Sequence, residues 1–248
     1  MTYCVGMQID KGLVFMSDTR TNSGVDNVSV YRKMSNWHTE GDRVITLLSS
    51  GNLATTQTVV SLLDERSKVP EERKPSILQA PTMFQVARLV GDTLQEVIAT
   101  RAESGPEADN TFSGTLILGG QIVGMPPRLY LIYPAGNFIE APEDSPFLQI
   151  GETKYGRPIL VRAYNRWLSF EDAVKLLLVS FDSTIRANLS VGLPIDIHVY
   201  ETDSLSMRPR IRINEGDPYF ETISEGWGTA LRSAFHSLPD FSFDRAQS

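Results

Sequence analysis

Residues 2–18 read TYCVGMQIDKGLVFMSD, and this stretch sets the fold class. Two apolar runs within it, 2–9 and 13–18, have the length and composition of β-strands. The loop between them is short and ends in Gly12, which can adopt the left-handed conformation that tight hairpins require. The sequence therefore predicts that the chain opens with an antiparallel β-hairpin.

The register of this hairpin decides which side chains meet near its open end. If residues 10–12 form the loop, Cys4 faces Asp18. Asp18 then shares a face with Thr2, because side chains alternate along a strand. A bulge at the loop would shift the register by one residue and change these neighbours. The opposite face is expected to be the apolar one, carrying Tyr3, Val5, Met7, Leu13 and Phe15.

The remaining sequence predicts strands in groups rather than in strict alternation with helices. Further strands are expected at 28–39, 43–49, 112–118, 128–133, 137–140, 147–150, 195–201 and 208–213. Helices are expected at 52–66, 81–101, 154–163, 169–189 and 218–237. Grouped strands favour an α+β fold with antiparallel sheets over a parallel, doubly wound sheet. No repeat or break in composition marks a boundary, so we expect a single domain over residues 1–248.

The bulk composition argues against several classes of function. A net charge of −7 and a pI near 5.1 do not fit a nucleic-acid-binding protein. The histidines and the single cysteine, Cys4, show no metal-ligand spacing, so we expect no metal and no cofactor. The N-terminus lacks the features of a secretory signal, and no run approaches the roughly 20 apolar residues of a membrane span. We therefore expect a cytoplasmic protein without membrane contact.

A threonine near the N-terminus, beside a carboxylate and a lysine, has a specific chemical use. A threonine hydroxyl is a weak nucleophile that needs a base. If Thr2 became the first residue, its own α-amine could take the proton, since the pKa of a free terminal amine is about 7.7–8.0. Lys33, held in place by Asp18, would lower this pKa through like-charge repulsion. The alternative stays open at this point, because all three residue types are common and have ordinary structural roles.

Longer motifs give the chain a family resemblance. The segments Gly12–Arg20, Arg32–Met34 and Leu47–Gln57 resemble proteasome β-type subunits, which begin with a catalytic threonine on a strand. The bacterial Anbu branch, the ancestral β-subunit, shares three further motifs. These are Gly24–Asn27, Ile150–Leu160 and Ser190–Asp196. The resemblance runs from residue 2 to about 200, and residues 201–248 are then expected to be a C-terminal extension.

This resemblance implies both a fold and a set of roles. The fold is a four-layer αββα sandwich of two antiparallel sheets flanked by helices, as in N-terminal-nucleophile (Ntn) hydrolases. Thr2 would be the nucleophile and, through its amine, the general base, while Asp18 orients Lys33 and Lys33 tunes the amine. The backbone N–H of Gly51 would stabilise the oxyanion, which suits a donor at a helix N-terminus. Ser190 matches a family serine that supports the terminal amine.

Two positions depart from the family pattern. Glu152 stands where the better-known proteasomes have serine, and near Asn188 a supporting aspartate of the family is missing. The core residues are retained, but their surroundings are changed, so activity could be weak, selective or absent. Met1 precedes a small residue, so we expect the cell's aminopeptidase to remove it without any propeptide.

The sequence thus predicts a threonine-type peptidase that cleaves peptide or amide bonds inside a large homo-oligomer, either a closed ring or a lock-washer spiral. Two alternatives remain. One is a weak or inactive self-assembling scaffold or binding protein, and the other is an amidase for a small amide substrate. The resemblance also implies an ATP-grasp enzyme and a transglutaminase-like protein as partners.

Overall fold

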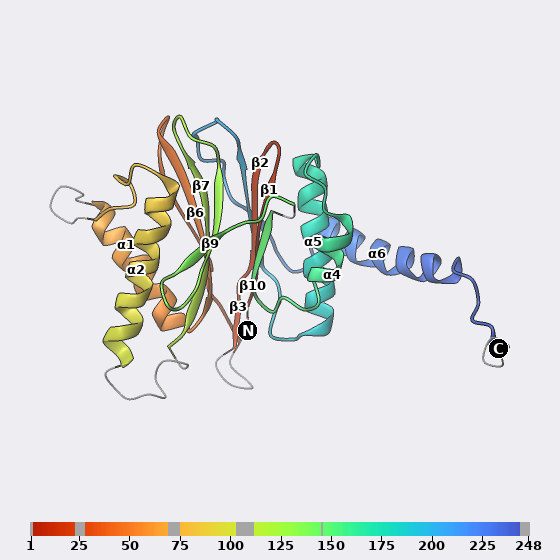
Figure 1. Cartoon of the computed structure of the whole chain (residues 1–248). Coiled ribbons are helices and arrows are strands. Elements are labelled where there is room, and N and C mark those ends of the chain that lie inside the picture. The colour runs from red at the N-terminus through yellow and green to blue at the C-terminus, as the bar shows by residue number, and fades with distance from the viewer. Residues whose placement is uncertain (1, 23–27, 69–74, 103–111, 145, 244–248) are drawn as a thin grey trace.

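A computed structural model describes residues 2–22, 28–68, 75–102, 112–144 and 146–243 (Figure 1). The first antiparallel sheet has the order β10 (Phe147–Gly151), β1 (Tyr3–Ile9), β2 (Gly12–Asp18), β11 (Ile195–Glu201) and β12 (Ile211–Ile213). The second has the order β5 (Met34–Thr39), β6 (Arg43–Gly51), β7 (Gly114–Ile122), β8 (Arg128–Ile132) and β9 (Phe138–Glu140). Two short strands, β3 (Arg20–Asn22) and β4 (Val28–Val30), pair separately.

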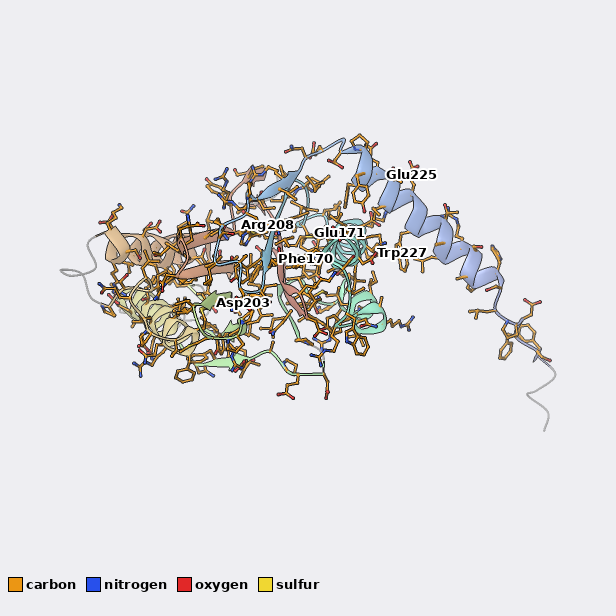
Figure 2. All side chains as sticks on the ribbon, turned by 90° about the horizontal axis from the view of Figure 1, so that it is seen from above. Phe170, Glu171, Asp203, Arg208, Glu225 and Trp227 are labelled. Atoms are coloured by element: carbon orange, nitrogen blue, oxygen red, sulfur yellow. The ribbon has the colours of Figure 1, made fainter. Side chains whose placement is uncertain are left out.

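The helices cover the outer faces of the two sheets (Figure 1). On the second sheet lie α1 (Leu53–Lys68) and α2 (Met83–Ala102), and on the first lie α4 (Arg157–Ala163) and α5 (Phe170–Ala187). The last helix, α6 (Pro218–His236), leads away from the layers, as Figure 2 also shows. No helix in these described ranges is long and apolar enough to cross a membrane.

Three clusters of buried apolar side chains hold the layers together. One lies between the first sheet and α4–α5, and it contains Tyr3 and Phe181. A second joins the other sheet to α1 and α2. The third lies between the two sheets and includes Phe15 and Ile117. Three apolar interfaces require four layers, so the predicted α+β fold, an αββα sandwich, is confirmed.

The first hairpin has a register that differs by one residue from the expected one. Its loop is only residues 10–11, so Cys4 pairs with Ser17 rather than with the residue after it. Gly12 is a strand residue at φ +150°, and a Cβ there would lie 2.0 Å from the carbonyl oxygen of Tyr200 in β11. The glycine therefore lets β11 pack closely against the start of β2, and the loop shortens.

The expectation of one apolar face on this hairpin is also wrong. Tyr3 and Val5 pack toward the helices, whereas Leu13 and Phe15 pack toward the second sheet. Strands in the inner layers of a four-layer fold have apolar neighbours on both sides, so alternation disappears.

The strand expected at 28–39 is in fact two strands that belong to different sheets. β4 pairs with β3, while β5 joins the edge of the second sheet beside β6. Residues 31–33 cross between them, and this crossing brings Lys33 to the end of β2. Apolar patterning could not reveal the crossing, because both pieces have strand composition. The other expected strands and helices are present with modest shifts at their ends.

His198 is a buried titratable group between the two sheets. It lies in β11, and its Nδ1 is 3.0 Å from the hydroxyl of Thr46 and 3.3 Å from the amide nitrogen of Asn36. Burial is the main cause that lowers the pKa of this imidazole, to about 4, with the charge of Arg210 acting in the same direction. The ring is therefore neutral in the folded protein at pH 7.

We predict that the free energy of unfolding falls as the pH drops from about 6.5 to about 4. The unfolded chain protonates His198 in this range and the folded chain does not, so acid favours unfolding by about 3 kcal/mol in the limit. His198→Asn keeps a polar group near Nδ1 without a titrating ring and should show a flatter dependence. Urea unfolding at several pH values measures this, and equal slopes for both proteins would contradict it.

Candidate active site

Three of the expected site residues line one cleft of about 600 Å³. Thr2 precedes β1 and is 9% exposed, Lys33 is the last residue of the crossing from β4 to β5, and Gly51 ends β6 just before α1. Residues far apart in the chain are thus brought together where the two sheets meet. Hydroxyl-bearing side chains make up much of the remaining wall: Thr21, Ser49, Ser50 and Thr56.

Asp18 lies beneath this cleft and fixes two of its parts. The ammonium of Lys33 donates to Asp18 Oδ1 at 2.7 Å and to the carbonyl oxygen of Arg20 at 2.6 Å. The backbone N–H of Tyr3 donates to the same Asp18 oxygen at 2.9 Å. Burial raises the pKa of the Asp18 carboxyl, and the charge of Lys33 acts in the opposite direction. One carboxylate therefore positions both the lysine and the backbone next to Thr2.

Two glycines at the edge of the cleft allow a close approach between backbone segments. Gly51 has φ +115°, and a Cβ there would lie 2.4 Å from the carbonyl oxygen of Ser113. Gly151 has φ +83°, and its Cβ would lie 1.9 Å from the carbonyl oxygen of Thr2. A side chain at Gly151 would push Thr2 away, and one at Gly51 would push β6 away from the start of β7. The sequence singled out only Gly51, although the glycine that ends β10 was a signal of the same kind.

Gly51 also stands at the start of a helix. Asn52 follows it, and its side-chain oxygen accepts the backbone N–H of Thr55 at 3.1 Å, as an N-cap does. The first N–H groups of a helix are unpaired within the helix and carry partial positive charge. This end of α1 therefore suits the stabilisation of an oxyanion in the cleft.

The two positions that depart from the family pattern contact each other. The side-chain amide of Asn188 donates to Glu152 Oε2 at 3.0 Å, and the backbone N–H of Glu152 donates to the carbonyl oxygen of Thr2 at 2.7 Å. Glu152 is only 8% exposed. The chain thus lacks the family's aspartate near position 188, but it has a carboxylate at the contacting position 152. Each change was visible in the sequence, but their pairing across 36 positions was not.

Ser190 is not among the residues that line the cleft. It lies in the loop after α5, where its backbone N–H donates to the side-chain oxygen of Asn188 at 3.0 Å. Arg20 holds the same loop by donating to the carbonyl oxygen of Leu189 at 3.0 Å. The structure therefore links Ser190 to Glu152 through Asn188, and this contact runs through its backbone.

Other chemistries find little support in the described residues. Cys4 is fully buried, and burial raises the pKa of its thiol, which does not suit a nucleophile. No group of three or more His, Cys, Asp or Glu side chains is placed to hold a metal ion within the described ranges. Met1 and the Gly24–Asn27 motif lie outside the described residues.

Comparisons with known proteins place these observations in a family. No protein-family model matches the chain. A proteasome subunit beta of Haloquadratum walsbyi is 26% identical over 208 residues, which cover 83% of this chain and 76% of that protein. Among solved structures, Anbu (ancestral beta-subunit) from Yersinia bercovieri is 45% identical with a TM-score of 0.90, covering 98% of this chain and 100% of that chain.

Two further solved structures agree. Anbu from Hyphomicrobium sp. strain MC1 is 48% identical with a TM-score of 0.88, covering 97% of this chain and 100% of that chain. The helical assembly of the Anbu complex from Pseudomonas aeruginosa is 45% identical with a TM-score of 0.90, covering 98% and 99%. Identity at this level over nearly the whole of both chains shows common family as well as common fold. The chain therefore belongs to the Anbu family of proteasome-like Ntn hydrolases.

Proposed function

We propose that this protein is a threonine peptidase that uses Thr2 as its nucleophile. The observation that carries the proposal is the placement of Thr2, Lys33 and Gly51 in one cleft, with Asp18 bound to Lys33 beneath it. These groups supply a nucleophile, a tuning cation and an oxyanion donor at a single point. A scaffold without catalysis would place no such demand on these positions.

The proposed reaction is amide hydrolysis through an acyl-enzyme. With Met1 removed, the neutral α-amine of Thr2 accepts the hydroxyl proton while Oγ1 attacks the carbonyl carbon. The backbone N–H of Gly51 stabilises the oxyanion. The C–N bond then breaks, and the amine leaving group takes the proton. Water next attacks the ester with the same amine as base, which releases the carboxylic acid and restores Thr2.

The walls of the cleft support a peptide as the substrate class. A volume of about 600 Å³ exceeds the need of one side chain, and the end of β6 offers backbone groups to an extended peptide. The hydroxyls of Thr21, Ser49 and Ser50 favour small or polar side chains at the position next to the cleaved bond. A small amide is the alternative substrate, and a comparison of hydrolysis rates with tripeptide and free-amide substrates separates the two.

We predict that an N-terminal-threonine-directed epoxyketone or β-lactone forms one covalent adduct with the wild-type protein. Thr2→Ala should form none, because the attacking oxygen is gone. Lys33→Ala should react about 100-fold more slowly or worse, because the base loses its tuning charge. Intact-mass spectrometry measures the adduct and also shows whether Met1 has been removed.

Thr100→Ala is the matched control, since it removes a threonine hydroxyl on α2, outside the cleft. It should keep the adduct. A processed N-terminus that no probe modifies in the wild-type protein would favour the scaffold alternative instead.

We further propose that residues 1–248 form one domain, whose part beyond residue 200 serves self-assembly. The helical assembly of the Pseudomonas aeruginosa relative supports self-assembly as such. In this chain, the proposed role in self-assembly is supported by the apolar surface of α6 and of the segment after it. Leu231 is 51% exposed, Phe235 71%, Phe241 75% and Phe243 83%. Clustered exposure of large apolar side chains is typical of protein–protein contact.

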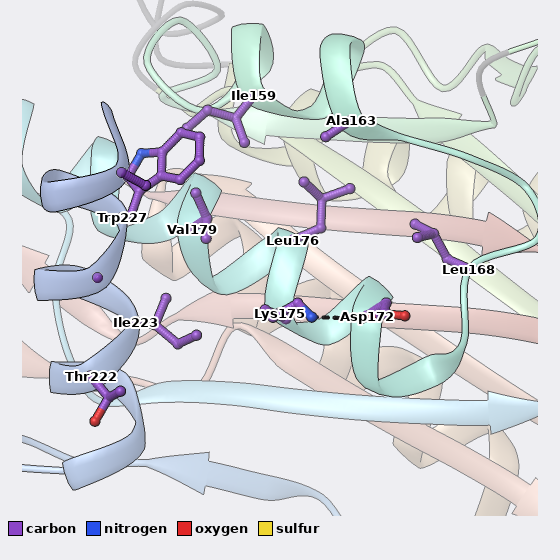
Figure 3. A pocket seen from close by; sticks show the side chains of 12 residues that line it. Ile159, Ala163, Leu168, Asp172, Lys175, Leu176, Val179, Thr222, Ile223 and Trp227 are labelled. Carbon is purple, nitrogen blue, oxygen red and sulfur yellow. Dashed lines mark hydrogen bonds and ion pairs between the residues drawn. The ribbon is translucent and has the colours of Figure 1, made fainter. Parts of the chain in front are cut away.

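An apolar cavity next to α6 fits this role. It measures about 420 Å³ and lies between α4, α5 and α6, with the Trp227 ring directed toward Ile159 and Val179 (Figure 3). Figure 3 shows a single ion pair on its wall, between Asp172 and Lys175. We propose that a second copy of this chain covers this surface.

We predict that Phe235→Asp combined with Phe241→Asp lowers the mass of the assembly, because charge is costly in an apolar contact. Light scattering after size-exclusion chromatography measures the mass. Val123→Asp is the control, since Val123 is 51% exposed in the turn after β7. An unchanged mass in the double variant contradicts a role of α6 in assembly.

A further inference from the structure

The position of Glu152 relative to Thr2 follows from the pairing of β1 and β10. Tyr3 pairs with Gly151, and the backbone N–H of Glu152 donates to the carbonyl oxygen of Thr2 at 2.7 Å. This bond extends the pairing of β1 and β10 by one residue beyond the ends of both strands. Glu152, the residue after β10, is thus bonded through its backbone to Thr2, the residue before β1.

The side chain of Glu152 is buried and held. It is 8% exposed, and the neutral amide of Asn188 donates to its Oε2 at 3.0 Å. Asn188 is itself fixed at the end of α5, where its backbone N–H donates to the carbonyl oxygen of Thr184 at 2.9 Å. Within the described ranges no Lys, Arg or His forms an ion pair with Glu152. A carboxylate this buried normally requires a charged or strongly donating partner.

We propose that the missing partner is the α-ammonium of Thr2, which donates to the Glu152 carboxylate and is oriented by it. This inference rests on the proposed function, because it concerns the amine that acts as base there. Asn188 holds the carboxylate in place, so both residues are positioning residues for the amine. A charge-assisted hydrogen bond of this kind is short and directional.

The other charges around the amine do not replace this contact. Asp18, at the end of β2, is already neutralised by Lys33 at 2.7 Å. Lys33 repels an ammonium and lowers its proton affinity. Arg20, on β3, donates to the loop after α5 and lies 3.8 Å from the carboxylate of Glu215. Glu152 is therefore the negative charge that is free to favour the protonated amine.

This arrangement has a consequence for the pH dependence of the reaction. A carboxylate beside the amine stabilises the ammonium and raises its pKa, in opposition to Lys33. The base must be neutral to accept the proton of the Thr2 hydroxyl, so the active form accumulates only at higher pH. Removal of the charge should move the rising limb of the pH profile toward acid.

The experiment titrates the α-amine directly, on protein whose intact mass shows Thr2 as the first residue. Trace isotopic acetic anhydride reacts with the neutral amine between about pH 5 and pH 10. Mass spectrometry of the N-terminal peptide then gives the titration midpoint. We expect Glu152→Gln to lower this midpoint by about one pH unit, which is about tenfold more neutral amine at pH values below both midpoints.

Glu140→Gln is the matched control, because it removes one carboxylate on the edge strand β9, where Glu140 pairs with Arg128 of the neighbouring strand β8. Its midpoint should equal that of the wild type. If Glu152→Gln does not fold, Glu152→Ser removes the same charge with a smaller side chain and should shift the midpoint in the same direction. Equal midpoints in the wild type and in the folded neutral variant overturn the proposal.

Labelling by the threonine-directed probe, run in parallel, separates this inference from the proposed function. If the titration midpoint of the amine shifts in the neutral Glu152 variant but neither this variant nor the wild type forms an adduct, the result supports the positioning role of Glu152. It then contradicts catalysis by Thr2. If the wild type and the neutral Glu152 variants all form the adduct and share one titration midpoint, the result supports catalysis by Thr2 and contradicts the role of Glu152.

Discussion

The buried ion pair of Asp18 and Lys33 joins the first sheet to the crossing between the two sheets. Asp18 ends β2 in the first sheet, and Lys33 stands where the chain crosses to the second. The pair is almost completely buried, because the side chain of Asp18 is 0% exposed and that of Lys33 is 6% exposed. Loss of one partner from a buried pair costs about 3–5 kcal/mol, because the other charge is left without compensation. The Tyr3 N–H donates to the same Asp18 oxygen as Lys33, and the Arg20 carbonyl oxygen accepts a second hydrogen bond from Lys33.

This pair also fixes the start of β1, and with it the position of Thr2, the proposed nucleophile. The cleft forms only where both sheets end together, and glycines at its edge let backbone approach backbone. Gly51 and Gly151 adopt left-handed conformations that a side chain would strain, and each contacts a carbonyl oxygen. Backbone atoms at the ends of strands thus form part of the surroundings of Thr2. Such groups need little reorganisation, which is the basis of electrostatic catalysis.

Helix α5, which covers the outer face of the first sheet, connects the site to the outer surface of the molecule. The end of α5 carries Asn188, which holds Glu152. Earlier on the same helix, Asp182 accepts from Ser224 of α6 at 2.6 Å and pairs with Arg186. α5 therefore lies between the apolar surface proposed for assembly and the carboxylate proposed to orient the amine. One rigid helix supports both, so assembly and the geometry of the site share a structural element.

The sequence alone was informative wherever local pattern decides structure. Strand and helix composition gave the order of the elements, and the segments around Thr2, Asp18, Lys33 and Gly51 indicated the family that the comparisons show. Local pattern failed where long-range packing decides. It missed the hairpin register, which depends on the close approach of β11 to Gly12, and the crossing at residues 31–33.

The contact of Glu152 with Asn188 is another feature that local sequence pattern could not reveal. Each residue was visible as a departure, but only the fold shows that one carboxylate and one amide face each other. By itself, the sequence determined the layered α+β fold, the family and the candidate nucleophile, because propensity and motif are local properties. The tertiary structure decided which charges meet at Thr2, because contacts across many residues are set by the packing of two sheets and not by any segment alone.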